Sequence, residues 1–269
     1  MGLLQEFANG DTVFVPVDPA NVHYPEHGAE ILAEMEEDHF WFVIRRKLIL
    51  NLLRRFVKAP DSKTPVNGLD IGCGTGFNAV FLTEQGLPTY GIDAYQGFSK
   101  FQKAKRGMGF IQGDIFKIEP KPEFDFVLLL DVIEHIEGDD RFLKRSFEFL
   151  KPNGVVIITA PAFKFLWSTN DDYSGHLRRY TKGSLMKLLE QTHIPIKIEK
   201  MYYFYGALLP FYMLSRFLSK FSPQSGAAEI KPSPLLNLVF KLLLKAETVF
   251  QPFNGMPMGS SVFACIRKC

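Results

Sequence analysis

Short apolar runs alternate with amphipathic stretches through the centre of the chain. The runs predict seven strands, at residues 66–71, 88–93, 110–111, 124–130, 155–160, 194–203 and 261–266. Apolar positions at helical spacing predict the intervening helices, at residues 77–85, 95–106, 139–150 and 181–191. The run 124–130 is apolar except at Asp125, which favours a central strand covered on both faces. Alternating strands and helices predict an α/β protein with a largely parallel sheet.

Both flanks of this pattern differ from its centre. Residues 1–29 read as loop, and residues 29–57 are helical, with acids toward the front and bases toward the back. Two strongly apolar helices, 204–221 and 235–250, precede the last predicted strand. Neither is a convincing transmembrane span, because the first is interrupted and the second is too short. The second helix carries a narrow polar stripe, made by Asn237, Lys241, Lys245 and Thr248.

The most informative stretch is the turn after the first of these strands, LDIGCGTGFN at residues 69–78. Its glycines leave no Cβ atoms in the way, so a ligand can lie against the backbone and the N–H groups that open the next helix. Asp93 ends the second strand, 21 positions after Gly72 (93 − 72). At this spacing a carboxylate meets the two hydroxyls of a bound ribose. An ordinary tight turn is the alternative interpretation.

Asp70, Asp93 and the Gly113-Asp114-Ile115 segment follow three successive strands in order. With the glycine turn they resemble the class I S-adenosylmethionine-dependent methyltransferases, from about residue 66 to residue 160 and again at the last strand. The resemblance implies a doubly wound, Rossmann-like sheet of seven strands, six parallel and the last antiparallel. It implies one methyltransferase domain over residues 1–269. Its parts are a helical cap (1–60) and a cofactor-binding core (66–203 and 261–268). Residues 204–260 depart from the family, whose last two strands usually have a short connection, and are predicted to be an amphipathic helical insertion.

The same resemblance assigns the cofactor, S-adenosylmethionine, with S-adenosylhomocysteine as product. We expect the helices at residues 29–57 to close over the cofactor, with Trp41 as an apolar lid and Arg45 or Arg46 paired with the methionine carboxylate. The pattern H-x-W-F-x-x-R-R, from His39, resembles a bacterial subgroup of these methyltransferases. Charges that merely match helix dipoles are the alternative. The expected cofactor residues are Trp41, Arg45, Arg46, Asp70, Gly72, Cys73, Gly74, Asn78, Asp93, Ala94, Asp114, Ile115, Asp131 and Val132.

Methyl transfer to an oxygen requires in-line alignment and a base for the acceptor proton, and histidine suits that role. His135 lies in the DVIEHI stretch, which resembles quinone-pathway O-methyltransferases and should border the methyl group. His176, with Arg178, Arg179 and Tyr180, forms a second candidate group that binds an anionic acceptor or is simply a solvated basic turn. The catalytic candidates are His135, His176 and Tyr180. No metal is predicted, because adjacent acids and a histidine are a poor ligand pattern.

Composition narrows the setting without changing the fold. The 269 residues are 46% hydrophobic and 22% charged, which is globular, and a net charge of +2 gives no sign of nucleic-acid binding. Three cysteines without metal-ligand spacing suit a reducing cytoplasm, and we expect no signal peptide. None of the nine tyrosines has a lysine four positions on, which argues against a common class of nicotinamide reductases.

The apolar insertion points to the acceptor. Residues 203–250 carry five basic and two acidic side chains, a net +3 (5 − 2), which favours helices lying in a membrane interface. We therefore expect methyl transfer to an oxygen or nitrogen of a lipophilic or lipid-linked acceptor, on the cytoplasmic membrane face. The alternatives are a soluble small acceptor, with the insertion as lid or homodimer interface, and a non-catalytic cofactor-binding or membrane-scaffold protein.

Overall fold

A computed structural model describes residues 12–14, 28–58, 64–95, 109–219, 232–249 and 256–269. All but one residue of the predicted helix 95–106, and the link between the two apolar helices, lie outside these ranges.

The described strands form one sheet in the order β1-β4-β3-β2-β5-β6-β8-β7. All neighbours are parallel except β8, which runs antiparallel to both β6 and β7. The strands are β1 (Thr12–Phe14), β2 (Gly68–Ile71), β3 (Thr89–Asp93), β4 (Phe110–Gln112), β5 (Phe124–Leu130), β6 (Leu150–Pro161), β7 (Ile196–Phe204) and β8 (Ser261–Lys268). Without β1 this is the predicted seven-stranded sheet, so the fold class is confirmed.

The eighth strand, β1, is a departure from the prediction. It occupies three residues of the stretch that the sequence pattern identified as loop, and Thr12 lies beside Phe110 of β4. A three-residue edge strand is too short to show an alternating pattern of its own. Pairing with β4 therefore defines it, and the local sequence does not.

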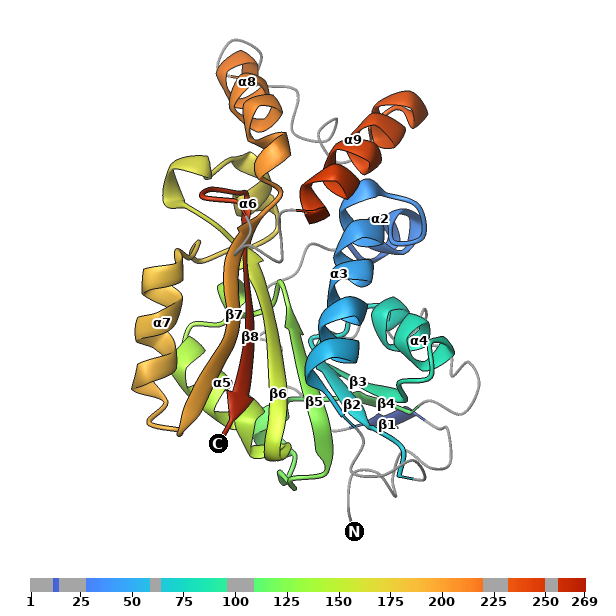
Figure 1. The fold of residues 1–269 in the computed structure, drawn as a ribbon, viewed down its shortest axis with the longest axis vertical. Coiled ribbons are helices and arrows are strands. Elements are labelled where there is room, and N and C mark those ends of the chain that lie inside the picture. Colours follow the sequence, from blue (N-terminus) through green and yellow to red (C-terminus); the bar gives the residue numbers. More distant parts are fainter. Residues whose placement is uncertain (1–11, 15–27, 59–63, 96–108, 220–231, 250–255) are drawn as a thin grey trace.

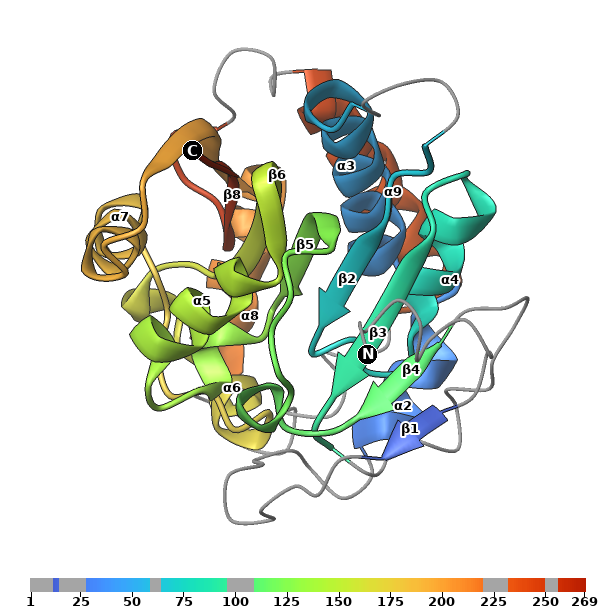
Figure 2. The same cartoon turned by 90° about the horizontal axis from the view of Figure 1, so that it is seen from below.

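Helices cover both faces of the sheet (Figures 1 and 2). Buried side chains of α5 and α7 pack on one face, and those of α3, α4 and α9 pack on the other. The described α-helices are α2 (Gly28–Met35), α3 (Phe40–Phe56), α4 (Phe77–Glu84), α5 (Asp139–Glu148), α6 (Thr169–Tyr173), α7 (Lys182–Gln191), α8 (Leu209–Ser219) and α9 (Pro234–Glu247). The doubly wound architecture leaves the carboxyl ends of the parallel strands open for a ligand.

The two insertion helices, α8 and α9, lie between β7 and β8 in sequence and stand at one end of the molecule (Figure 1). Aromatic side chains connect these helices to each other and to α3. The centre of the Phe240 ring of α9 lies 5.3 Å from that of Phe211 in α8 and 5.0 Å from that of Phe40 in α3. Among the described helices, none combines the length and apolar character needed to cross a bilayer.

Candidate active site

The glycine turn joins β2 to α4 at the open end of the sheet. Gly72 has a φ of +74°, and a Cβ there would lie 2.5 Å from a methyl carbon of Val132. Only glycine fits this backbone, since both its conformation and its close neighbour exclude a side chain. The turn thus brings β2 close to the segment that follows β5.

A cavity of about 810 Å³ opens beside this turn. Its wall comes from the carboxyl ends of β2 to β6, from the segments around α2, α3 and α6, and from Tyr212 of α8. The predicted site residues that line it are Trp41, Arg45, Gly72, Cys73, Gly74, Asn78, Asp93, Ala94, Asp114, Ile115, Asp131, Val132, His135 and His176. Asp70, Arg46 and Tyr180 do not line it.

Asp93 stands at the end of β3 with both carboxylate oxygens held in place. One accepts a hydrogen bond from the Gly74 backbone N–H (2.7 Å), and the other accepts one from that of Tyr95 (2.8 Å). Burial raises its pKa to about 6, and these two backbone bonds oppose that rise. Asp114 is fixed similarly, because its carboxylate accepts from the Phe116 N–H at 2.9 Å. Both acids keep lone pairs for a ligand.

At the end of β5, Arg45 of α3 forms a hydrogen-bonded ion pair with Asp131. Asp131 has a φ of +56°, and its second oxygen accepts from the Thr159 hydroxyl at 3.0 Å. A non-glycine residue in this region is conformationally costly and often marks a functional site. The pair holds the α3 helix against the point where the strand order reverses.

Asp70 lies behind the turn and is 1% exposed. Neither of its carboxylate oxygens has a hydrogen-bond partner within the described part of the chain. Burial raises its pKa to about 7, against the lowering effect of nearby Arg45. Asp70 therefore supports the site from behind the glycine turn and does not line the cavity.

Arg46 departs from its expected place. Its guanidinium donates to the backbone carbonyls of Glu36 and Glu37, and it lies 4.4 Å from the centre of the Phe77 ring. Successive residues of a helix point about 100° apart, so Arg45 and Arg46 cannot both face the cavity. Arg46 instead ties the end of α2 to α3 and α4.

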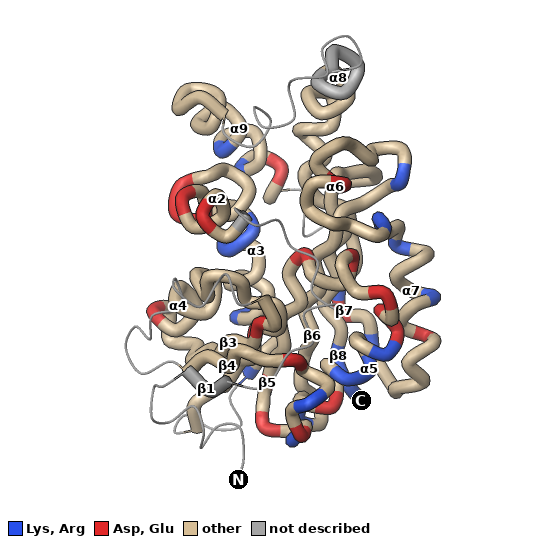
Figure 3. Tube along the Cα trace, turned by 180° about the vertical axis from the view of Figure 1, so that it is seen from behind, with Lys and Arg blue, Asp and Glu red and all other residues tan. Residues whose placement is uncertain are grey.

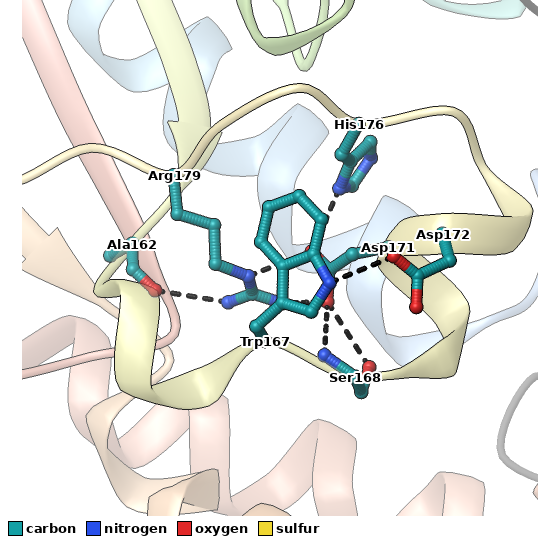
Figure 4. A network of polar contacts seen from close by, with 7 residues as sticks. All are labelled: Ala162, Trp167, Ser168, Asp171, Asp172, His176 and Arg179. Atoms are coloured by element: carbon teal, nitrogen blue, oxygen red, sulfur yellow. Dashed lines mark hydrogen bonds and ion pairs between the residues drawn. The ribbon is translucent and has the colours of Figure 1, made fainter.

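His176 lines the cavity and is held by a buried acid (Figure 4). Its Nδ1 lies 2.8 Å from a carboxylate oxygen of Asp171, which is 1% exposed. Arg179 donates to both oxygens of the same carboxylate, at 2.7 and 2.9 Å. Burial opposes ionisation of Asp171, but the bonds from His176 and Arg179 hold its pKa well below the usual range. Asp171 is a site residue that the sequence interpretation missed.

The side chains of the basic turn pair with acids of the protein, and their binding of an anionic acceptor stays a prediction. Arg179 is consumed by Asp171, and Arg178 pairs with Asp139 at 2.8 Å. Tyr180 is 3% exposed, and its hydroxyl donates to Asp139 at 2.8 Å. Burial raises the pKa of Tyr180 well above its usual value, so it cannot serve as a base near neutral pH. Of this group, only His176 and Arg179 border the cavity.

His135 follows β5, as expected for the DVIEHI stretch, and lines the cavity next to His176. Their ring centres are 4.8 Å apart in a perpendicular arrangement. One ligand atom each from Glu134, His135 and His176 lies within 4.8 Å of the others. His176 joins this group through the fold, although it is distant in sequence from the other two residues. The absence of a metal stays a prediction.

Comparison with known proteins agrees with this geometry. Residues 35–194 match a family model described as a methyltransferase domain. The ubiquinone biosynthesis O-methyltransferase of Rickettsia typhi is 30% identical over 150 residues, covering 48% of this chain and 60% of that protein. Norajmaline N-methyltransferase of Rauvolfia serpentina is 32% identical over 123 residues, covering 42% of each chain. The chain thus matches three-fifths or less of the length of these curated relatives.

Among solved structures, Haemonchus contortus phosphoethanolamine N-methyltransferase 2 in complex with S-adenosyl-L-methionine has a TM-score of 0.54. It is 19% identical, and the superposition covers 90% of this chain and 56% of that one. That likeness shows the fold. The cradle formed by Gly72 and the carboxylate of Asp93 fit the expected cofactor. Because the family model matches more than half of the sequence, this chain belongs to the family of S-adenosylmethionine-dependent methyltransferases.

Proposed function

We propose that this protein transfers the methyl group of S-adenosylmethionine to an oxygen of a lipophilic acceptor at a membrane surface. The observation that carries the proposal is His176, held by the buried Asp171 carboxylate on the wall of the cofactor cavity. When bound, the cofactor supplies a methyl group on a positively charged sulfur. Asp93, whose carboxylate is fixed by the Gly74 N–H, would hold its ribose.

The Asp171–His176 pair supplies the base that an oxygen acceptor needs. The ionised carboxylate accepts a hydrogen bond from the N–H at Nδ1 of His176. Nε2 is then the nitrogen without a proton in the neutral ring, and it can act as the acceptor. An imidazole fixed in that tautomer can take the proton of an acceptor hydroxyl as the methyl group is transferred. The His135 ring packs against the His176 ring, with 4.8 Å between the two ring centres.

The insertion helices support a lipophilic acceptor. Apolar side chains of α8 and α9 remain exposed: Leu235 by 71%, Leu242 by 58% and Met213 by 58%. Figure 3 shows few charged residues along the described part of these helices. Such an unpartnered apolar surface is typical of membrane or protein contact.

The orientation of α9 strengthens this interpretation. Asn237 and Lys241 of its polar stripe face the protein. Asn237 accepts from the Phe40 N–H at 2.8 Å and donates to the Asp38 carboxylate at 3.0 Å, and Lys241 also pairs with Asp38. Leu244 is buried against the core, but the leucines named above are exposed, so α9 carries apolar side chains on its outer side as well as its inner side. Tyr212 connects α8 to the cavity wall, so an acceptor at this surface would be near the site.

Vesicle flotation tests the membrane contact. We expect the protein to float with anionic vesicles, and Leu235→Ser with Leu242→Ser to weaken binding about tenfold or more, since a fully buried leucine contributes about 1.5–3 kcal/mol. Phe165→Ser is the matched control, because Phe165 is 59% exposed but lies outside the insertion. A protein that stays in solution as a tight dimer would instead favour the dimer interface.

Turnover of radiolabelled S-adenosylmethionine on a lipid extract tests the activity. His176→Ala should cut turnover about 100-fold or more while leaving cofactor affinity nearly intact. Full turnover by His176→Ala would favour a base-independent acceptor. Turnover of soluble small molecules alone would favour the lid interpretation, and no turnover on either would leave the scaffold alternative.

A further inference from the structure

Glu36 is a buried carboxyl group in the cavity that no role yet explains. It directly follows α2, is 4% exposed, and lines the cavity beside the glycine turn. Its carboxylate accepts a hydrogen bond from the hydroxyl of Thr75, which belongs to that turn. Its backbone carbonyl accepts from Arg46. The Thr75 bond therefore holds the side chain at the turn, and the Arg46 bond holds the backbone of the same residue.

The surroundings of Glu36 carry charges of both signs. Arg45 and Arg46 lie near it, and so does the Asp70 carboxyl, which interacts electrostatically with Glu36. The Nε atom of Arg45 and both oxygens of Asp70 are buried and have no hydrogen-bond partner in the described ranges. Burial raises the pKa of Glu36 to about 7, although the Thr75 bond and both arginines lower it. This wall can thus stabilise an additional cation and an additional anion.

A zwitterion is the ligand that such a wall complements. The methionyl end of S-adenosylmethionine has an ammonium and a carboxylate on one carbon. An ammonium group has three donors and no acceptor, so it needs carboxylate or carbonyl oxygens. Of the two acids here, only Glu36 lines the cavity; Asp70 lies behind it.

We propose that Glu36 binds the ammonium group of the methionyl end of the cofactor, with Arg45 near the carboxylate and Asp70 supporting the charge from behind. The ammonium takes the place of the Thr75 hydroxyl as donor to Glu36. Because a nearby cation favours the ionised carboxylate, binding of the cofactor releases a proton near neutral pH. The inference concerns the cofactor alone and does not depend on the acceptor proposed above.

Titration calorimetry with two ligands tests this assignment. S-adenosylhomocysteine contains the amino-acid part, whereas 5′-methylthioadenosine has the same adenosine without it. Glu36→Gln should weaken S-adenosylhomocysteine binding about 10- to 100-fold, the effect of losing one charge-assisted bond, and leave 5′-methylthioadenosine within twofold. Retained 5′-methylthioadenosine binding also shows that the variant is folded.

Two further variants separate binding from structural support. Glu37→Gln is the matched control, because Glu37 is exposed and should affect neither ligand. Thr75→Val removes the hydrogen bond but keeps the carboxylate, so it should preserve the preference for S-adenosylhomocysteine. The proposal is overturned if Glu36→Gln weakens both ligands equally, if it weakens neither, or if Thr75→Val reproduces its selective loss.

Discussion

Replacing Asp171 with asparagine should be among the most destabilising single polar substitutions at the site. The carboxylate accepts bonds from the Ser168 backbone and hydroxyl, from His176, and from two nitrogens of Arg179. The amide of the Asp171→Asn variant would keep the shape but lose the charge, and would leave an 8% exposed guanidinium without its counterion. Breaking a buried pair in this way costs about 3–5 kcal/mol, so we expect a loss of that size at pH 7.

Denaturant unfolding at several pH values measures this loss. The pKa of Asp171 is lowered on folding, so its contribution is complete above the unfolded pKa of about 3.9 and is lost as the pH falls further. The gap between wild type and Asp171→Asn should therefore narrow below about pH 4. Asp172→Asn is the control, because Asp172 accepts an exposed bond from Trp167, worth about 1 kcal/mol or less. Equal losses at 171 and 172, or a gap at pH 3 as large as the gap at pH 7, would refute this reasoning.

Four other predictions concern the site and its support. Asp93→Ala should weaken S-adenosylhomocysteine binding about 10- to 100-fold in calorimetry, because about 1.5–3 kcal/mol of charge-assisted bonding is lost; unchanged affinity would remove Asp93 from the site. Affinity for the same ligand should rise between pH 5.5 and 7.5, as Asp93 (pKa about 6) and Glu36 (pKa about 7) ionise, and a flat profile would contradict this. The stability of the ligand-free protein should instead fall as the pH rises. Asp70, with its pKa raised to about 7, contributes stability fully below about pH 4 and loses this contribution as the pH rises to 7. Asp70→Asn should therefore make the melting temperature less dependent on pH between 4 and 7. Tyr180→Phe should cost about 1–3 kcal/mol of stability through the lost bond to Asp139 but leave turnover at saturating acceptor unchanged; a large loss of turnover would restore Tyr180 as a catalytic residue.

The fold was predictable where a local pattern has one structural solution. The strand at residues 124–130 was predicted with the bounds that β5 has, because a strand covered on both faces must be apolar nearly throughout. The glycine turn and Asp93 were predictable for a similar reason, since the ligand's shape fixes their spacing. By contrast, β1 could not be predicted, because it is defined by pairing with β4, which is far from it in the sequence.

Side-chain partners across long sequence distances were the least predictable part of the site. Asn237 contacts Phe40, 197 positions away, and such distant contacts are needed to tell which way α9 faces. Glu36 and Asp171 each lie beside other acidic residues in the sequence. Helix dipoles or solvent exposure are the ordinary explanations of such acids. Pairs of adjacent acids gave no sign of which one is buried. Three-dimensional packing alone separates Asp171 from its exposed neighbour Asp172.

The position of β8 has a consequence for how this protein is made. β8 lies between β6 and β7 but follows both in sequence, with seven residue pairs to β6 and eight to β7. While the ribosome is still adding the residues before β8, β6 therefore has an open edge, and β7 lacks the strand that joins it to the sheet. Open edges recruit strands of other chains, and distant contacts form slowly. Loss of β8 should therefore leave the edge of β6 open and promote aggregation.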